Sequence, residues 1–210
     1  MKTIQSTRGR PKSGEVSFRV ESLLDIAAKV FMEAGFRDAK MIDIAKRAGA
    51  SKTTLYNLYP TKNDLFRSVI SRKIKLLEEQ LNSTLTFDNE LPVLLHSFGR
   101  KLIDTLMHGE LRSLFNIVIT ERNLFPELAE FFWQAGPGNC IKILGQYLDI
   151  HPDFTGKNSL LSAEIFVSLC WGTFLLRSLL IHNFHMSDEE IDNHLTKSVG
   201  IFVDQYCRET

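Results

Sequence analysis

Side chains that hydrogen-bond well gather on a short stretch of the chain, at Lys52, Thr53, Tyr56 and Asn57. In a helix this spacing places all four on one face. Lysine and threonine can contact phosphates or base edges, tyrosine can hydrogen-bond a phosphate, and asparagine can pair with adenine through two hydrogen bonds. The face therefore has the chemistry of a DNA reader. The alternative, which is favoured for any one of these residues alone, is an ordinary helical hairpin with a polar exterior.

Two short helices are needed to hold this face in place. Residues 43–59 have the pattern of a short helix, a glycine turn and a second short helix. Gly49 allows a turn that a residue with a Cβ resists, and Ser51 is a natural N-cap for the second helix. The apolar positions are spaced to bury a shared seam: Ile44, Ala45, Ala48, Leu55 and Tyr59. This plan is typical of a helix-turn-helix, whose second helix lies in the major groove of DNA.

The charge distribution supports a nucleic-acid partner, although the formal net charge of the 210 residues is zero. Residues 1–82 hold 16 Lys and Arg against 9 Asp and Glu, whereas residues 83–210 hold 9 against 16. A basic first part followed by an acidic second part indicates a nucleic-acid-binding module joined to a region of another kind.

Several classes of protein are excluded by what the sequence lacks. The three cysteines form no C-x-x-C pair, which argues against a disulfide framework or a zinc site. The basic N-terminus has no apolar signal-peptide core, and the longest uncharged apolar run has 12 residues, where a membrane span needs roughly 20. No phosphate-binding glycine loop, nucleophile elbow or carboxylate pair appears. We therefore expect a cytoplasmic protein that is not an enzyme and needs no cofactor or metal.

Helical periodicity runs through the chain, and no alternating strand pattern appears, so we expect an all-α fold of about nine helices. The first helix should end at Gly35, and Thr61 should cap a fourth helix together with Asp64. The helices beyond the helix-turn-helix are expected at about 63–82, 91–107, 111–124, 127–149, 159–183 and 188–207.

Residues 16–66 resemble, without a gap, the N-terminal domain of the tetracycline-repressor (TetR) family of bacterial transcriptional regulators. The motifs that carry the resemblance are Leu24-Asp25-Ile26-Ala27-Ala28-Lys29-Val30-Phe31, Gly35-Phe36, Ile44-Ala45-Lys46-Arg47-Ala48-Gly49-Ala50-Ser51-Lys52-Thr53-Thr54-Leu55-Tyr56, Tyr59-Pro60-Thr61-Lys62 and Leu65-Phe66. The resemblance implies an all-helical homodimer that binds an operator of two half-sites and a small effector. It implies DNA contacts by Ser51, Lys52, Thr53, Thr54, Tyr56 and Asn57, and a phosphate contact by Lys62.

The resemblance also implies the division of the chain. We expect a basic tail at 1–15, the DNA-binding domain at 16–62, a linking helix at 63–82, and an effector-binding and dimerisation domain at 83–210. Three positions depart from the family pattern. The family commonly has Ser or Thr where this chain has Ala39-Lys40, so the cap of the second helix is absent or moved to Asp38, and Lys40 is a further candidate phosphate contact. Thr53 replaces the usual glycine, and Leu58 stands where a phosphate-binding His or Tyr is usual.

The N-terminal tail contains Arg8-Gly9-Arg10-Pro11, which resembles the core of an AT-hook. Arg8 and Arg10 could follow the floor of a narrow A·T minor groove. A solvated basic tail that adds nonspecific phosphate attraction is an equal alternative.

The acidic part resembles the C-terminal domain of the AefR-like branch of the same family over Leu111–Gly136. A set of aromatic residues there is a candidate lining for an apolar effector cavity. The set is Phe98, Phe115, Phe131, Phe132, Trp133, Phe166, Trp171 and Phe174, with Arg122 and Arg177 as candidate anchors for an anionic effector. For each aromatic residue alone a packed core is the alternative, and for each arginine a structural ion pair.

The last two helices have the pattern of a dimer interface, because residues 160–181 are apolar nearly all round. The candidate interface residues are Phe166, Leu176, Leu180, Leu195, Val199, Phe202 and Tyr206. Two such helices and their symmetry mates would form a four-helix seam. Two further features are weak candidates for chemistry. His182 and His185 more simply stabilise a helix C-terminus than bind a metal, and Cys170 is more simply a packing residue than a thiol sensor.

These patterns together favour a DNA-binding repressor that a small molecule releases from its operator. An activator or pleiotropic regulator of the same fold is the first alternative, and an interaction protein that does not bind DNA is the second.

Overall fold

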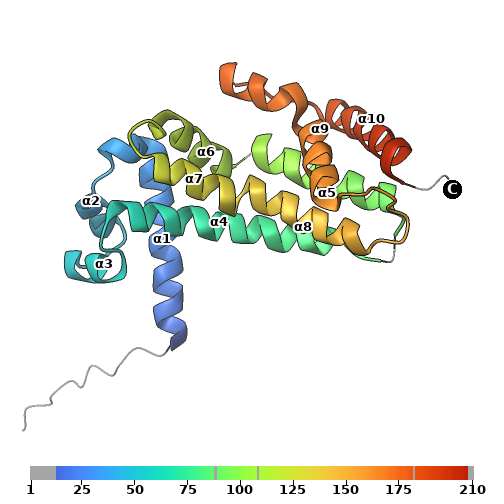
Figure 1. Ribbon diagram of the computed structural model, residues 1–210. Coiled ribbons are helices and arrows are strands. Elements are labelled where there is room, and N and C mark those ends of the chain that lie inside the picture. Colours follow the sequence, from blue (N-terminus) through green and yellow to red (C-terminus); the bar gives the residue numbers. More distant parts are fainter. Residues whose placement is uncertain (1–12, 88, 108, 182, 208–210) are drawn as a thin grey trace, which may run out of the picture. The chain divides into compact units, whose positions relative to one another are not determined.

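The computed structural model describes residues 13–207, apart from positions 88, 108 and 182. The described chain is helical, and its one β-bridge joins Phe154 and Cys207. The helices are α1 Ser13–Asp38, α2 Met41–Arg47, α3 Lys52–Leu58, α4 Lys62–Thr84, α5 Leu91–Met107, α6 Glu110–Glu121, α7 Pro126–Ala135, α8 Pro137–Ile150, α9 Ser159–Leu180 and α10 Asp188–Tyr206. The predicted all-α class is confirmed (Figure 1).

One predicted helix, at 127–149, is two helices in the structure. Gly136 has φ −95° and ψ −98°, outside the helical region, and separates α7 from α8. Pro137 then occupies the first turn of α8, where a missing backbone N–H costs nothing. The predicted end of the first helix is also visible, because Gly35 has φ 74° and interrupts the helical path of α1.

The chain divides into two compact units within α4, one ending at Val69 and the other beginning at Ile70. We call them the N-terminal unit and the C-terminal unit. The core of the N-terminal unit is built on three fully buried rings, Phe31 and Phe36 of α1 and Phe66 of α4. Their centroids lie 4.9 to 6.0 Å apart. These rings anchor the first turns of α4 to α1, so the start of α4 belongs to the same packed unit as the helix-turn-helix.

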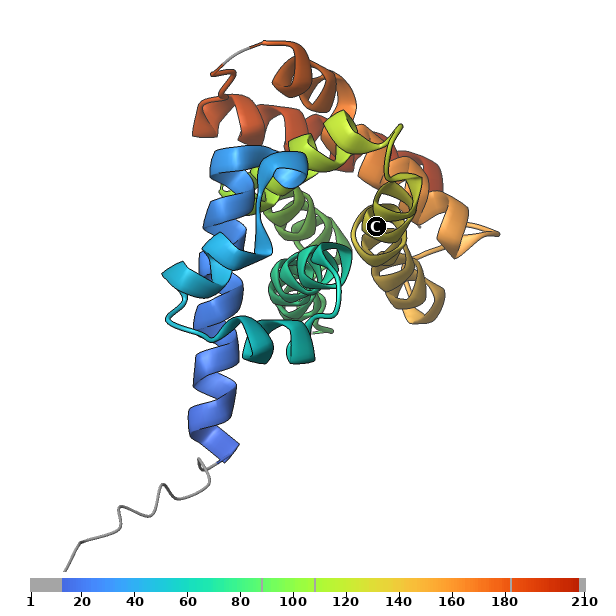
Figure 2. The same cartoon turned by 90° about the vertical axis from the view of Figure 1, so that its left-hand side faces the viewer.

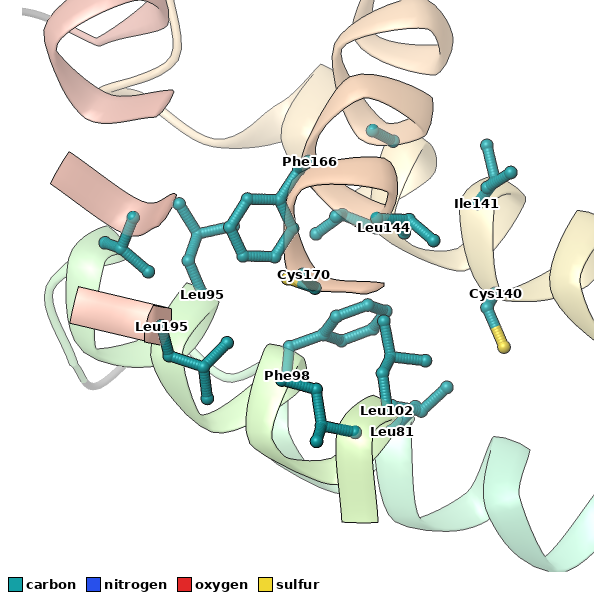
Figure 3. Packing of buried hydrophobic residues seen from close by; sticks show 14 of the residues in the cluster. Leu81, Leu95, Phe98, Leu102, Cys140, Ile141, Leu144, Phe166, Cys170 and Leu195 are labelled. Atoms are coloured by element: carbon teal, nitrogen blue, oxygen red, sulfur yellow. The ribbon is translucent and has the colours of Figure 1, made fainter. Parts of the chain in front are cut away.

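The C-terminal unit packs α9 against α5, α8 and α10. Figure 2 looks nearly along α5 and α8, which lie across the view in Figure 1. Phe98, Phe166, Cys170 and Leu195 meet in its core (Figure 3). Gly99 permits the close crossing of α5, because an added Cβ would lie 2.6 Å from Leu195 Cδ2 and 2.9 Å from Cys170 Sγ.

Helix α9 is more apolar than its burial requires. By length and composition it is the one helix in the described part of the chain that could cross a membrane, and 28% of its most apolar stretch is buried. A helix that packs against protein passes the same test. Gly172, with φ 43° and ψ −136°, breaks the helical path of α9 near its middle.

Candidate DNA-binding interface

The two helices of the predicted helix-turn-helix are α2 and α3. Ile44, Ala45 and Leu55 are buried between them and the rest of the N-terminal unit. Gly49 adopts φ 62° in the turn, and the backbone N–H of Ala50 donates to the carbonyl of Ala45 at 2.9 Å. This left-handed position is the reason for a glycine at 49, since a side chain would strain the same backbone.

Ser51 caps α3, as predicted. Its Oγ accepts a hydrogen bond from the backbone N–H of Thr54 at 3.0 Å and lies 2.7 Å from Thr54 Oγ1. Both hydroxyls are exposed, so their outer sides face solvent while they hold the first turn of α3 in shape. The cap thereby fixes the backbone at the end of the helix that is predicted to point at DNA.

The predicted recognition face of α3 is exposed. Lys52, Thr53, Tyr56 and Asn57 all face solvent, and the Lys52 ammonium lies 5.8 Å from the centre of the Tyr56 ring. Leu55, on the opposite side, is completely buried. Hydrogen-bonding groups thus line one side of α3 and its apolar anchor lies on the other, which is the arrangement that base and phosphate contacts require.

The ends of α2 and α3 show the departures from the family pattern. Lys40 occupies the N-cap position of α2 in extended conformation, and no side chain caps that helix in the described structure. The alternative cap by Asp38 is therefore not formed. Lys40 is exposed and free to face a phosphate. Leu58 is 44% exposed at the end of α3, an apolar side chain on an otherwise polar surface.

An exposed ion pair and a half-buried tyrosine lie between α1 and the helix-turn-helix. Arg47 of α2 pairs with Glu33 of α1 at 2.5 Å. Tyr59 is half-buried after α3, and burial, with a smaller contribution from the nearby Glu21 carboxylate, raises the pKa of its phenol. The Tyr59 side chain is therefore a neutral packing group at neutral pH.

The start of α4 forms the predicted reciprocal cap. The backbone N–H of Thr61 donates to Asp64 Oδ2 at 3.0 Å, and the Asp64 N–H donates to Thr61 Oγ1 at 3.1 Å. Lys62 lies beside this cap. Its ammonium donates to the carbonyls of Arg37 and Ala39 at 2.7 and 3.0 Å and lies 4.9 Å from the centre of the Phe36 ring. Lys62 thus ties α4 to the connection between α1 and α2, a role that the sequence did not reveal.

Some residues of the other predicted sites lie outside the part of the chain that the structure describes. Arg8 and Arg10 of the basic tail and His182 are among these. His185 is exposed, and the described residues contain no group of three side chains that could hold a metal ion. Burial raises the pKa of Cys140 to about 12 and of Cys207 to about 11, and raises that of Cys170 as well. Thiols of this kind are poor nucleophiles, which favours the packing role of Cys170.

The candidate effector residues are spread over the C-terminal unit rather than gathered in one cavity. Phe98 and Phe166 are completely buried in its core, and Phe132, also buried, stacks on Phe115 at 5.4 Å. Trp171 and Phe174 line a small apolar cavity. The remaining four lie nearer the surface: Phe131 is half-buried, and Trp133, Arg122 and Arg177 are exposed.

The two candidate arginine anchors have local partners. Arg122 donates to the carbonyl of Ile119, and Arg177 lies 4.4 Å from the centre of the Phe184 ring. Arg112 lines an open cavity instead. Its Nη1 donates to the carbonyls of Met107 and Phe184, and its Nη2 to that of Ser178, at 3.1 to 3.4 Å. The sequence did not reveal this role of Arg112. The available signal was Gly109, which precedes α6 with φ 89° and places Arg112 in the first turn of that helix.

The candidate dimer residues separate into two groups. Leu176 and Leu180 are 57% and 74% exposed. Phe166, Leu195, Val199 and Phe202 are buried inside the protomer, and Tyr206 is half-buried beside Phe202. The buried side chains pack between α5, α9 and α10 of the same protomer, so they cannot contact a second copy directly. They can only stabilise the helices that carry an interface.

Comparison with known proteins places this geometry in context. Residues 23–69 match the sequence profile of bacterial regulatory proteins of the tetR family, and residues 94–208 match that of the C-terminal domain of AefR-like transcriptional repressors. The transcriptional repressor ComR of Escherichia coli is 35% identical over 71 residues, 34% of this chain and 32% of ComR. The transcriptional activator FasR of Mycolicibacterium smegmatis is 38% identical over 69 residues, 32% of each chain. These matches span about a third of each relative's length.

A solved structure resembles nearly the whole chain. The flavonoid-responsive regulator FrrA is 27% identical, superposes with a TM-score of 0.79, and is matched over 92% of this chain and 100% of its own. The likeness therefore extends through the C-terminal unit, beyond the segment shared with ComR and FasR.

Proposed function

Because the chain belongs to the TetR family of bacterial transcriptional regulators, which are not enzymes, we propose that it is a repressor released from its operator by a small effector. The observation that carries the proposal is the exposed polar face of α3, held by the Ser51 cap and the buried Leu55. The AefR-like profile over residues 94–208 describes repressors and supports the direction of regulation.

The residues proposed to contact DNA fall into two roles. Thr53, Tyr56 and Asn57 face outward from α3 and supply hydroxyl and amide groups for base edges and the nearest phosphates. Lys40, Lys52, Ser51 and Thr54 stand at the N-terminal ends of α2 and α3, where helix N–H groups and ammonium groups attract phosphate. The tail arginines Arg8 and Arg10 add a minor-groove or phosphate contact.

We propose that the chain acts as a homodimer through α9 and α10. A surface of exposed apolar side chains supports this: Leu160, Leu161, Leu176, Leu179, Leu180, Ile181 and Ile201. Monomeric soluble proteins rarely leave so many large apolar side chains on neighbouring elements. Two copies related by a two-fold axis would present two α3 helices to half-sites about 34–36 Å apart on one face of the DNA.

The proposed effector binds the C-terminal unit. The resemblance to a flavonoid-responsive regulator over nearly the whole chain supports an apolar, ring-containing effector. A protein of this kind is proposed to work in the cytoplasm, at the nucleoid, where its operator lies.

The test is a gel shift with the DNA directly upstream of the protein's own gene at physiological salt. We expect a specific complex that a scrambled fragment does not form, and we expect the flavonoid naringenin, as a first probe, to weaken it. The Asn57→Ala variant should lose the specific complex, whereas the exposed control Lys75→Ala in α4 should keep it. Absence of any sequence-specific shift would contradict the proposal and favour an interaction protein.

The similarity to FasR favours one second candidate, a transcriptional activator. Transcription from the same promoter in vitro separates the two, because a repressor lowers the yield of transcript and an activator raises it.

A further inference from the structure

Most of the side chains proposed to contact DNA already have a partner within the N-terminal unit. The hydroxyls of Ser51 and Thr54 lie 2.7 Å from each other, and that of Ser51 also caps α3. The Lys62 ammonium donates to two backbone carbonyls, and the Lys52 ammonium lies 5.8 Å from the centre of the Tyr56 ring. These contacts hold the side chains in place and take up part of their capacity to bind bases.

Thr53 and Asn57 differ from the others in this respect. Both side chains are exposed, and neither makes a hydrogen bond or an ion pair within the described part of the chain. They stand four residues apart on α3, so they are neighbours on one face, with about 5–6 Å between their Cβ atoms. Leu55 on the opposite side is completely buried and fixes that face outward. The two side chains are therefore fully available to a groove of DNA.

Each of the two side chains has chemistry that suits one base. The asparagine amide can bind adenine through N6 and N7, and the threonine methyl can pack against the C5 methyl of thymine. The C5 methyl is an apolar group that the other three bases do not present in the major groove, so packing against it rewards thymine alone. Glycine, the usual residue of the family at position 53, has no side chain for such a contact. The contact would be a property of this chain.

The geometry of α3 also limits how far apart the two bases can lie. Thr53 is branched at Cβ, so few rotamers are open to it in a helix and its methyl is held close to the backbone. Successive bases of a DNA strand are about 3.4 Å apart along the helix axis. A Cβ separation of about 5–6 Å therefore corresponds to one or two base steps.

We propose that Thr53 gives the operator a preference for thymine, because its methyl packs against the C5 methyl of a thymine one or two base steps from the adenine that Asn57 binds. The Thr53 methyl, and not its hydroxyl, is the group that discriminates. This inference rests on the proposed function, since it assigns a base preference to the same face of α3.

The test uses the operator duplex defined by a DNase I footprint. In a series of duplexes, one pair of thymines at equivalent positions of the two half-sites is replaced by deoxyuridine, which lacks the C5 methyl and keeps the base pair. A second series replaces adenines by 7-deazaadenine, which lacks the N7 acceptor. Fluorescence anisotropy at physiological salt gives the Kd of each duplex. We expect one thymine pair at which deoxyuridine raises the Kd roughly fourfold per half-site, as for one buried methyl group.

Variants of Thr53 separate its methyl from its hydroxyl. Thr53→Ser keeps the hydroxyl and should lose the response to deoxyuridine at that thymine pair, whereas Thr53→Val keeps a methyl and should retain the response. Thr54→Ser is the matched control, because it removes a methyl from the adjacent exposed threonine and keeps the hydroxyl that lies beside Ser51. It should retain the response. The readout is the ratio of the two Kd values within one variant, so a general change in affinity or stability cancels.

Three results would overturn the inference. The first is a response to deoxyuridine that is as large in Thr53→Ser as in the wild type at every thymine. The second is a response that Thr53→Val loses and Thr53→Ser keeps, which would assign the contact to the hydroxyl. The third is a separation of more than two base steps between the sensitive thymine and the adenine at which 7-deazaadenine weakens binding most.

Failure of this inference is distinguishable from failure of the proposed function. A protein that gives no footprint contradicts the proposed function. A protein that protects two half-sites and depends on Asn57, but shows no response to deoxyuridine that depends on Thr53, contradicts only the thymine preference.

Discussion

The two compact units use their apolar residues differently. In the N-terminal unit, Phe31, Phe36 and Phe66 form one cluster, and the neighbouring surface of α3 is largely polar. In the C-terminal unit the ring contacts are dispersed, as in Phe166 on Phe202 at 5.2 Å and Phe115 on Phe132 at 5.4 Å. That unit also leaves large apolar side chains such as Leu180 exposed.

The difference indicates what each unit still needs. The N-terminal unit buries its apolar residues around one centre and presents polar groups, which suits a rigid reader of a polar surface. The C-terminal unit keeps exposed apolar surface, and the buried indole N–H of Trp171 has no acceptor among the described residues.

The largest expected effect comes from breaking the aromatic centre of the N-terminal unit. Phe66→Ala should destabilise the protein by about 3–5 kcal/mol, because the ring is completely buried between two others. Phe87→Ala in the C-terminal unit is the control, since Phe87 is 62% exposed and contacts only the rings of Tyr147 and His151 among the described aromatic contacts, so it should cost about 1 kcal/mol. Chemical denaturation measures both, and equal losses would contradict the single-centre description.

A second variant tests the exposed apolar surface of the C-terminal unit. Leu180→Glu would bury a charge in the proposed interface, which costs several kcal/mol, and should convert a dimer to a monomer at micromolar concentration. Leu124→Glu is the matched control, because Leu124 is 57% exposed in the turn that follows α6. Light scattering gives the mass, and a wild-type protein that is already monomeric would contradict the dimer.

Variants of Lys62 test whether this residue anchors α4 or contacts a phosphate of the DNA. Lys62→Met removes two charge-assisted hydrogen bonds and should lower the free energy of unfolding by about 2 kcal/mol, whereas Lys62→Arg should restore part of it. Operator affinity as a function of salt is measured alongside. If the magnitude of the slope of log K against log salt concentration falls by about 1, Lys62 makes the phosphate contact implied by the family resemblance. A free energy of unfolding that Lys62→Met leaves unchanged would contradict the anchoring role.

The smallest expected effect is on the pH dependence of stability. The pKa of Glu190 is lowered because its carboxylate accepts hydrogen bonds from Ser187, including one from the Ser187 backbone N–H at 2.8 Å. These contacts belong to the capping box that begins α10, in which the Glu190 backbone N–H also donates to the Ser187 hydroxyl. A lowered folded-state pKa stabilises the protein above the ordinary glutamate pKa, and this contribution is lost as the pH falls through the lowered value. Glu190→Gln should therefore lower Tm at neutral pH, and the gap from wild type should narrow on acidification. A gap that widens would contradict this assignment.

The sequence predicted the N-terminal unit well because its signals are local. Gly49 marks the turn, Ser51 the cap, and the Thr61–Asp64 pair the start of α4, and each acts within a few residues. The ring cluster and the Lys62 contact were not predictable, since they depend on which side chains meet across the fold.

The C-terminal unit was predicted less completely for the same reason. Its helices follow from periodicity, although the break at Gly136 divides one of them. Arg112 and Met107 were missed because their positions matter only once α5, α6 and α9 are brought together. Phe98, Phe166 and Trp171 are all large aromatic residues in apolar helices. Packing buries the two phenylalanines in the core and places Trp171 beside a cavity.

A DNase I footprint on the region upstream of the gene tests the central claim most directly, namely that the outward face of α3 reads DNA. We expect two protected half-sites about one helical turn apart, and we expect Asn57→Ala to lose protection at both while the protein remains folded. Uniform protection that is insensitive to Asn57→Ala, or no protection at physiological salt, would contradict the account.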